Sequence, residues 1–223
     1  MRTFVAIDFE TASARRDSAC AVGIAAGCAG RVVLSRTYLI RPPSAQFTFT
    51  DLHGLQWEDV RNAPTFAELW PTIRAWIADA AFVAAHNAPF DRSVLHACCA
   101  RYRLRPPPTR FACTVQLARA QWGIRPTKLP DVCRRLGIPL RHHDAGADAV
   151  ACARIVLAAE AGGWRLGKRR TRRTKTRTIV RVPRPTTAGS RWANRWHRMT
   201  FQHLLLTWWR RLQRAMTARW RRS

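Results

Sequence analysis

The chain has 223 residues, a length that suits one domain of ordinary size followed by an extension. Its 39 Lys and Arg residues far outnumber its 13 Asp and Glu residues. The seven cysteines include no Cys-x-x-Cys pair, which argues against a disulfide framework and a zinc knuckle. No apolar run reaches the ~20 residues that span a bilayer, which argues against a transmembrane protein. The first residues also lack the apolar core of a signal peptide, so we expect a cytoplasmic protein.

The N-terminal part of the chain predicts three strands. Thr3–Glu10 is rich in β-branched and aromatic residues, as buried strands are. Cys20–Ala26 and Arg31–Ile40 are two further strands, and the small residues of Gly27–Gly30 between them suit a hairpin turn. Arg41-Pro42-Pro43 ends the third strand, because proline donates no hydrogen bond to a sheet.

The middle of the chain predicts alternating helices and strands. Apolar residues at helical spacing indicate a helix over Thr65–Asp79, with Thr65 as its N-cap. The later predicted elements are strands over Ala81–His86 and Arg110–Val115 and helices over Asp91–Tyr102, Leu129–Leu136 and Asp144–Ala159. This order predicts an α/β domain over residues 1–162, a mixed sheet with helices on its faces.

The C-terminal extension has a different composition. Residues 161–223 contain 19 basic residues and no acidic residue. We expect a basic, disordered linker over residues 163–190 and a cationic amphipathic helix rich in Trp and Arg over residues 191–223. Three roles stay open for it: an anchor on nucleic acid, attachment to an anionic membrane surface, and a solvated tail without a specific role.

Two carboxylates end the first predicted strand. Asp8 and Glu10 lie two residues apart, so their side chains project from the same face of the strand. Such a pair is electrostatically costly at the end of an apolar strand unless a positive charge lies between them. A hard divalent cation would supply that charge. The alternative is that both residues are ordinary acids at the surface end of a strand.

Further acids and histidines follow in two later segments. Asp91 comes after a predicted strand and turn, and it opens a helix either as its N-cap or as a metal ligand. Asp144 can cap the last helix of the domain, and Asp148 lies one turn further along it. His143 precedes this helix in a loop, where a lone histidine is more often structural.

Together these segments resemble the DEDDh exonuclease family, which includes the proofreading subunit of bacterial DNA polymerase III. The resemblance covers about residues 3–158. The matching motifs are Asp8-Phe9-Glu10-Thr11, His86-Asn87-Ala88-Pro89-Phe90-Asp91, and His143 followed by four residues and Asp148. A weaker match is His53-Gly54-Leu55, where the family usually has isoleucine in third place.

The resemblance implies a fold, a cofactor and a catalytic base. The implied fold is RNase H-like, with a mixed five-stranded sheet flanked by helices. The implied cofactor is a pair of Mg²⁺ or Mn²⁺ ions. Asp8, Glu10 and Asp148 would hold one ion, and Asp8 would bridge to the other, which Asp91 supports. His143 would be the general base, and the neighbouring His142 lies one position off the motif spacing.

The resemblance also implies a substrate and an activity. Thr11, in the first motif, is expected beside the terminal 3′-hydroxyl. The other residues expected at the substrate are His53, Leu55, His86, Asn87 and Phe90. The implied activity is 3′→5′ removal of nucleoside 5′-monophosphates from single-stranded ends, with DNA favoured, and a polymerase or repair complex is a possible partner. The alternatives are an RNA-trimming exonuclease and a non-catalytic nucleic-acid-binding module.

Overall fold

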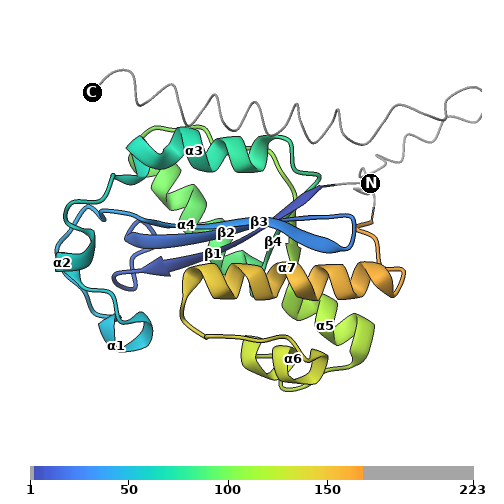
Figure 1. The fold of residues 1–223 in the computed structure, drawn as a ribbon. Helices are drawn as coiled ribbons and strands as arrows, with labels where there is room; N and C mark the ends of the chain where they lie inside the picture. The colour runs from blue at the N-terminus through green and yellow to red at the C-terminus, as the bar shows by residue number, and fades with distance from the viewer. Residues whose placement is uncertain (1–2, 168–223) are drawn as a thin grey trace, which may run out of the picture.

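The structure is a computed structural model that describes residues 3–167 (Figure 1). The helix expected over residues 191–223, and all but the first five residues of the expected linker over 163–190, lie outside this range. No helix among the described residues is long and apolar enough to cross a membrane.

A mixed five-stranded sheet forms the centre of the domain, as expected. Its strands are β1 (Phe4–Thr11), β2 (Ala19–Cys28), β3 (Arg31–Leu39), β4 (Val83–Ala85) and β5 (Phe111–Cys113). The order across the sheet is β3-β2-β1-β4-β5. The first three strands are antiparallel neighbours, whereas β4 runs parallel to β1 and β5 runs parallel to β4. The carboxyl ends of β1 and β4 therefore lie at the same edge, where Asp8 and Glu10 lie in the last half of β1 and the motif with Asp91 follows β4.

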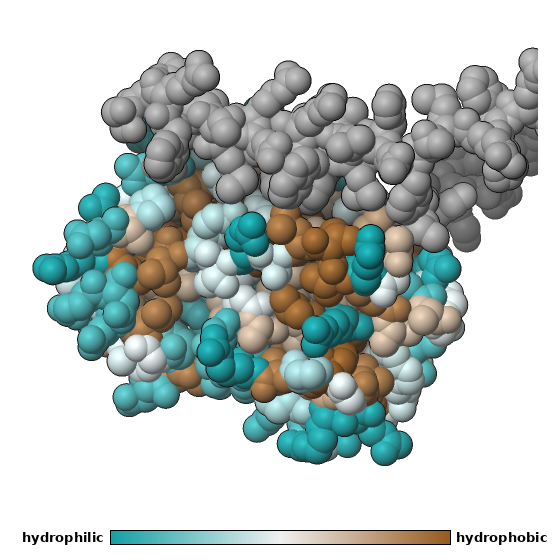
Figure 2. Space-filling view, in the orientation of Figure 1, coloured by the Kyte–Doolittle hydropathy of each residue, from teal (hydrophilic) through white to brown (hydrophobic). Residues whose placement is uncertain are grey.

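Helices cover both faces of the sheet (Figure 1). On one face lie α3 (Phe66–Ala78) and α4 (Ala88–Arg101), and on the other lie α5 (Thr114–Trp122), α6 (Leu129–Leu136) and α7 (Ala145–Ala161). The short helices α1 (Thr50–His53) and α2 (Trp57–Val60) lie beside one end of the sheet. Figure 2 shows apolar residues over the region of the alanine-rich α7, interrupted by a few polar residues, with further polar residues around the margin of this view.

The two helical layers pack on alternate residues of β1. Val5, Ile7 and Phe9 belong to the apolar cluster under α3 and α4. Phe4 and Ala6 belong to the cluster under α5, α6 and α7. Because side chains alternate along a strand, Asp8 and Glu10 project from the same face as Phe4 and Ala6, toward α7. The alternation of β1 therefore directs both carboxylates to the helix that carries Asp148.

Helix α4 begins earlier than the sequence suggested. Its first residue is Ala88, and Asn87, with φ of 63°, is its N-cap. The interpretation of Asp91 as an N-cap is therefore wrong, because Asp91 lies inside the first turn of the helix. Pro89 near the helix start explains the shift, since proline is well tolerated there and its fixed φ favours helix initiation.

Three helices were not predicted. The expected strand over Arg110–Val115 ends at Cys113, and Thr114 begins α5. β-Branched Thr114 and Val115 favour a strand locally, but packing of Leu117 and Ala118 against the cluster around α7 outweighs that preference. The other two, α1 and α2, have four residues each, too few for hydrophobic periodicity to show.

Candidate functional site

Three carboxylates meet where the carboxyl end of β1 approaches α7. Ligand atoms of Asp8, Glu10 and Asp148 all lie within 4.8 Å of one another. Glu10 and Asp148 are almost fully buried, with 8% and 3% of their surface exposed. Three acidic groups at this separation in a buried site repel one another strongly, so the site favours a positive ion between them.

Asp91 adds a fourth carboxylate from α4. Its Oδ1 accepts a hydrogen bond from the backbone N–H of Phe9, over 3.0 Å, and its side chain is buried. This bond holds Asp91 against the strand segment that carries Asp8. The pKa of Asp8 is raised well above its ordinary value, first by burial and then by the negative charges of Asp91, Asp148 and Glu10. The four predicted carboxylates therefore share one site.

The donor set fits a hard divalent cation. Burial raises the pKa of Glu10 to about 7 and that of Asp91 to about 8, and it also raises the pKa of Asp148. Among the described residues, Oδ2 of Asp91 and Oδ1 of Asp148 are buried without a hydrogen-bond partner. Buried carboxylate oxygens without donors are costly, and a cation would satisfy them. Ligation by oxygen alone is typical of Mg²⁺ and Mn²⁺ rather than zinc.

The stability of the protein should therefore depend jointly on pH and on Mg²⁺. Because the folded pKa values of Glu10 and Asp91 lie near 7 and 8, above the ordinary values of unfolded carboxyls, the metal-free fold should lose stability as pH rises from about 4 to 8. We expect the thermal midpoint in EDTA to fall over this range, and Mg²⁺ to raise it more at pH 8 than at pH 5. Asp8→Asn should flatten the pH dependence in EDTA. An equal effect of Mg²⁺ at both pH values would contradict this.

Two glycines that sequence reasoning missed allow α7 to approach the sheet. Gly23 of β2 is the register partner of Asp8, and a Cβ there would overlap the backbone of Ala145 and lie 2.6 Å from the backbone nitrogen of Gly146. A Cβ on Gly146 would in turn overlap the side chain of Thr37 on β3. The available signal was a glycine inside a strand, which often marks a close approach of another backbone.

The start of α7 is fixed as predicted. Asp144 is its N-cap, and its Oδ1 accepts a hydrogen bond from the N–H of Ala147, over 2.9 Å. Asp144 also forms an ion pair with Arg141. Asp148 follows in the first turn, so the cap sets the direction in which its carboxylate projects.

Both histidines before α7 belong to the site. Nδ1 of His142 lies 2.9 Å from Oδ2 of Asp148, and the backbone N–H of His143 donates to the same oxygen over 3.1 Å. The rings stack with centroids 3.8 Å apart. The ring nitrogens of His143 form no hydrogen bond with any residue in the described range. Burial and then neighbouring His142 lower the pKa of His143, which favours its neutral form. The direct contact of His142 with Asp148 was not predicted.

The His53-Gly54-Leu55 loop is tied to the end of β1. Nε2 of His53 donates to the carbonyl of Thr11 over 3.1 Å, and its Nδ1 accepts from the N–H of Leu55 over 3.1 Å. Gly54 ends α1 with φ of 77°, a left-handed conformation that suits glycine. Leu55 packs against the small apolar cluster of Ala12, Cys20 and Val60. The loop therefore lies beside the first acidic motif.

The residues of the second motif, His86–Asp91, differ in their contacts and in their exposure. Nδ1 of His86 lies 2.8 Å from the hydroxyl of Thr114, and its Nε2 donates to the carbonyl of Thr127 over 3.0 Å. His86 thus joins the end of β4 to α5 and to the segment before α6. Asn87 is exposed, whereas Phe90 is partly buried with the Arg16 guanidinium 4.4 Å from its ring centre.

A cavity of about 500 Å³ opens beside the acidic site. Asp8 and Asp148 line it together with His86, Asn87 and His142. Arg119 and Lys128, which sequence reasoning did not single out, also line it. The Nε of Arg119 donates to the hydroxyl of Thr127 over 2.9 Å, which fixes this guanidinium at the cavity. A cavity with clustered carboxylates and flanking cations can hold a phosphate ester next to metal ions.

The structure is similar to those of several solved nucleases. Exonuclease X in complex with 5′-overhanging duplex DNA has 21% identity and a TM-score of 0.61 over 73% of this chain and 94% of its own. The nuclease domain of 3′hExo, a DEDDh family member bound to rAMP, has 18% identity and a TM-score of 0.64 over 73% and 93%. Escherichia coli exonuclease I with an oligonucleotide has 15% identity and a TM-score of 0.59 over 72% and 41%.

These similarities confirm the RNase H-like fold. The family of the chain follows from a match to the sequence profile of one family. A comparison with curated proteins finds no match. The profile of the exonuclease family (RNase T) matches residues 5–156, which include all four carboxylates and both histidines of the site. The chain therefore belongs to the exonuclease family, whose members hydrolyse nucleic acid from its ends.

Proposed function

We propose that this exonuclease removes nucleotides in the 3′→5′ direction, requires Mg²⁺ or Mn²⁺, and releases nucleoside 5′-monophosphates. The observation that carries the proposal is the convergence of Asp8, Glu10 and Asp148 within 4.8 Å, with Asp91 held against the same strand segment. A binding module would have no use for buried carboxylates at a phosphate site, since they repel the ligand. The nucleic-acid complexes of the similar structures agree with a polymer substrate.

The carboxylates serve in this proposal as ligands of two ions. Asp8, Glu10 and Asp148 would hold one ion, and Asp91 together with Asp8 would hold the other. When bound, the ions supply positive charge to the attacking and leaving oxygens of the phosphodiester and lower the pKa of the attacking water. The protein itself contributes the fixed positions: the bond from Phe9 N–H holds Asp91, and the contact with His142 holds Asp148.

His143 acts as the general base. Its ring nitrogens are not engaged by other described residues, and its pKa is lowered, so neutral imidazole is available at neutral pH. His142, in contrast, already contacts Asp148 and positions that carboxylate. The end of β1 at Thr11 and the adjoining loop at Leu55 would receive the terminal nucleotide, since His53 fixes both.

A degradation assay tests the polarity, the metal requirement and the base. Single-stranded DNA labelled at its 5′ end should give a ladder that shortens from the 3′ end in Mg²⁺ and stays intact in EDTA. His143→Ala should slow the reaction about 10²–10⁴-fold, the usual contribution of a general base, and should remove the acidic limb of the pH–rate profile. His142→Ala should also lower the reaction rate, but its pH–rate profile should keep the acidic limb. Internal nicking, or shortening from the 5′ end, would contradict the proposal.

DNA is the preferred polymer in this proposal. The basis is the amino-acid sequence of the motif His86–Asp91, which resembles the polymerase-associated branch of the family more than the RNA-trimming branch. The measurement is the rate of release from DNA and RNA strands of the same sequence. A faster rate on RNA would assign the protein to RNA trimming while leaving the polarity and metal requirement intact.

A further inference from the structure

A second cavity lies near the acidic site, between α4 and the edge strand β5. It has a volume of about 440 Å³, within the range of small-ligand sites. Ala88 and Pro89 line it and directly follow Asn87, which lines the acidic cavity. Gln116 lines it and directly follows Val115, another residue of the acidic cavity. The two cavities are therefore neighbours across the first turns of α4 and α5.

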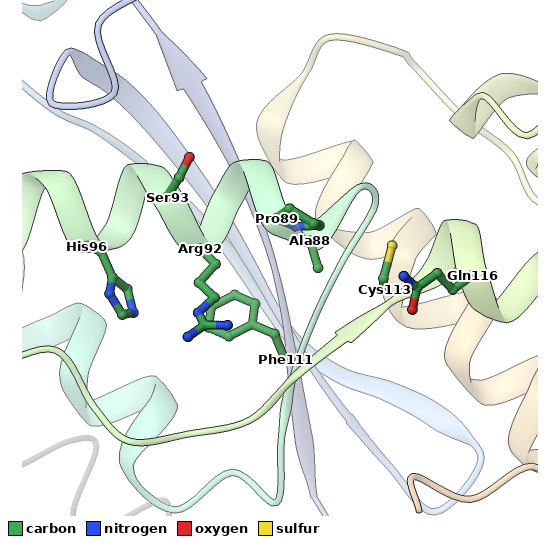
Figure 3. Close-up of a pocket in the computed structure, with 8 residues that line it drawn as sticks. All are labelled: Ala88, Pro89, Arg92, Ser93, His96, Phe111, Cys113 and Gln116. Carbon is green, nitrogen blue, oxygen red and sulfur yellow. The ribbon is translucent and has the colours of Figure 1, made fainter.

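The chemistry of this second cavity suits a nucleotide. Arg92 and His96 are exposed and lie one helical turn apart on α4, so both reach the same side. Figure 3 shows them projecting toward the side of the helix on which Phe111 lies, whereas Ser93 points away. Phe111 is only partly buried and lies on β5, the edge strand of the sheet. None of the residues lining the cavity is acidic.

We propose that this cavity binds an upstream nucleotide of the strand whose 3′ end lies at Asp8. Its base stacks on the exposed part of the Phe111 ring, and Arg92 contacts an adjacent phosphate. Stacking on an aromatic ring tolerates any base, and a guanidinium binds phosphate without reading sequence. Such a site suits an enzyme that shortens strands of many sequences. The inference rests on the proposed function for the position of the 3′ end.

The arrangement also meets an electrostatic need. The four carboxylates of the acidic site repel the phosphates of an approaching strand wherever cations do not neutralise them. Arg92 places positive charge at the cavity beside that site, where the rest of the strand would lie. Binding at this second cavity would therefore hold the polymer while its terminal phosphodiester reacts.

Photo-cross-linking tests the position of the upstream base. A single strand of about eight nucleotides, a length typical of single-strand binding sites, carries 5-iodouracil at one position at a time. The strand is bound to His143→Ala in Mg²⁺, so that cations neutralise the carboxylates while hydrolysis is slow, and the cross-linked peptides are identified by mass spectrometry. We expect one internal position to cross-link to Phe111. Cross-links that involve other residues but never Phe111, at any position, would overturn the inference.

Kinetics on strands of different length test the contribution of Arg92. The wild-type protein should show a lower KM for the longer strand than for a dinucleotide. Arg92→Glu should reduce that advantage about tenfold with little effect on kcat, because the variant loses its contact with phosphate. Phe111→Leu should reduce it by a similar factor, since leucine keeps the apolar packing of Phe111 but not its stacking. Arg154→Glu, an equal charge change on the exposed side of α7, should reduce it less than about twofold. An undiminished advantage in Arg92→Glu would overturn the inference.

The two proposals fail in different ways. A normal 3′→5′ ladder without any cross-link to Phe111 would remove the upstream site and leave the proposed activity intact. A cross-link to Phe111 without a ladder in Mg²⁺ would remove the proposed activity and leave a nucleotide-binding cavity.

Discussion

Asp148→Asn is expected to lower the rate of nucleotide release by at least about 10²–10³-fold, the usual loss when a fixed electrostatic group is removed from an active site. Asparagine keeps the size of the side chain and can still accept from the N–H of His143, but it carries no negative charge. The variant would thus lose one ligand from the group of carboxylates within 4.8 Å. Asp8→Ala should have an effect at least as large.

Loss of folding should not explain this result. Removing one of several mutually repelling carboxylates relieves a cost of the metal-free fold, so the thermal midpoint of Asp148→Asn in EDTA should not decrease. The matched control is Asp79→Asn, an exposed aspartate at the end of α3. It should keep wild-type activity in the same ladder assay. More than a tenth of wild-type activity in Asp148→Asn would remove this residue from the catalytic site.

Gly23→Ala is expected to impair both stability and catalysis. The added Cβ would overlap the backbone of Ala145, and backbone in the first turn of α7 cannot rotate out of the way as a side chain can. Overpacking of this kind costs about 1–3 kcal/mol, which corresponds to about 2–4 °C in the thermal midpoint for each kcal/mol. Because α7 carries Asp148, its displacement should also move that carboxylate away from Asp8.

The loss of activity should exceed what unfolding explains. A displacement of about 1 Å in a catalytic group can cost about 10²-fold in rate. We therefore expect kcat to fall about 10²-fold at a temperature where Gly23→Ala remains folded by circular dichroism. Gly167→Ala is the control, since a Cβ there meets no atom within 4 Å. Full activity in folded Gly23→Ala would mean that the position of α7 does not depend on this glycine.

The order of the main elements follows from local patterns in the sequence. Alternation predicted β1 and the shared face of Asp8 and Glu10, and periodicity with a capping residue predicted α3 from Thr65. The cap at Asp144 likewise follows from its preference for unpaired helix N–H groups. These features depend on neighbours within a few residues, so they can be recognised without knowledge of the fold.

Other features became visible only in three dimensions. Thr114 and Val115 favour a strand, yet they begin a helix because the residues after them pack against α7. Asp91 resembles a helix cap, yet its carboxylate accepts from Phe9, a residue far away in the sequence. No local pattern contains such a partner.

The sequence by itself determined which residues are candidates for the chemistry: four carboxylates and His143 in a fixed order, together with the strand face from which Asp8 and Glu10 project. The tertiary structure decided how they meet. It placed Asp148 opposite Asp8 through the contact of Gly23 with the start of α7, and it brought His142 rather than the His143 ring into contact with Asp148. The physical reason is that alternation and capping act between near neighbours, whereas the spacing of charges in the site depends on backbone packing between distant segments.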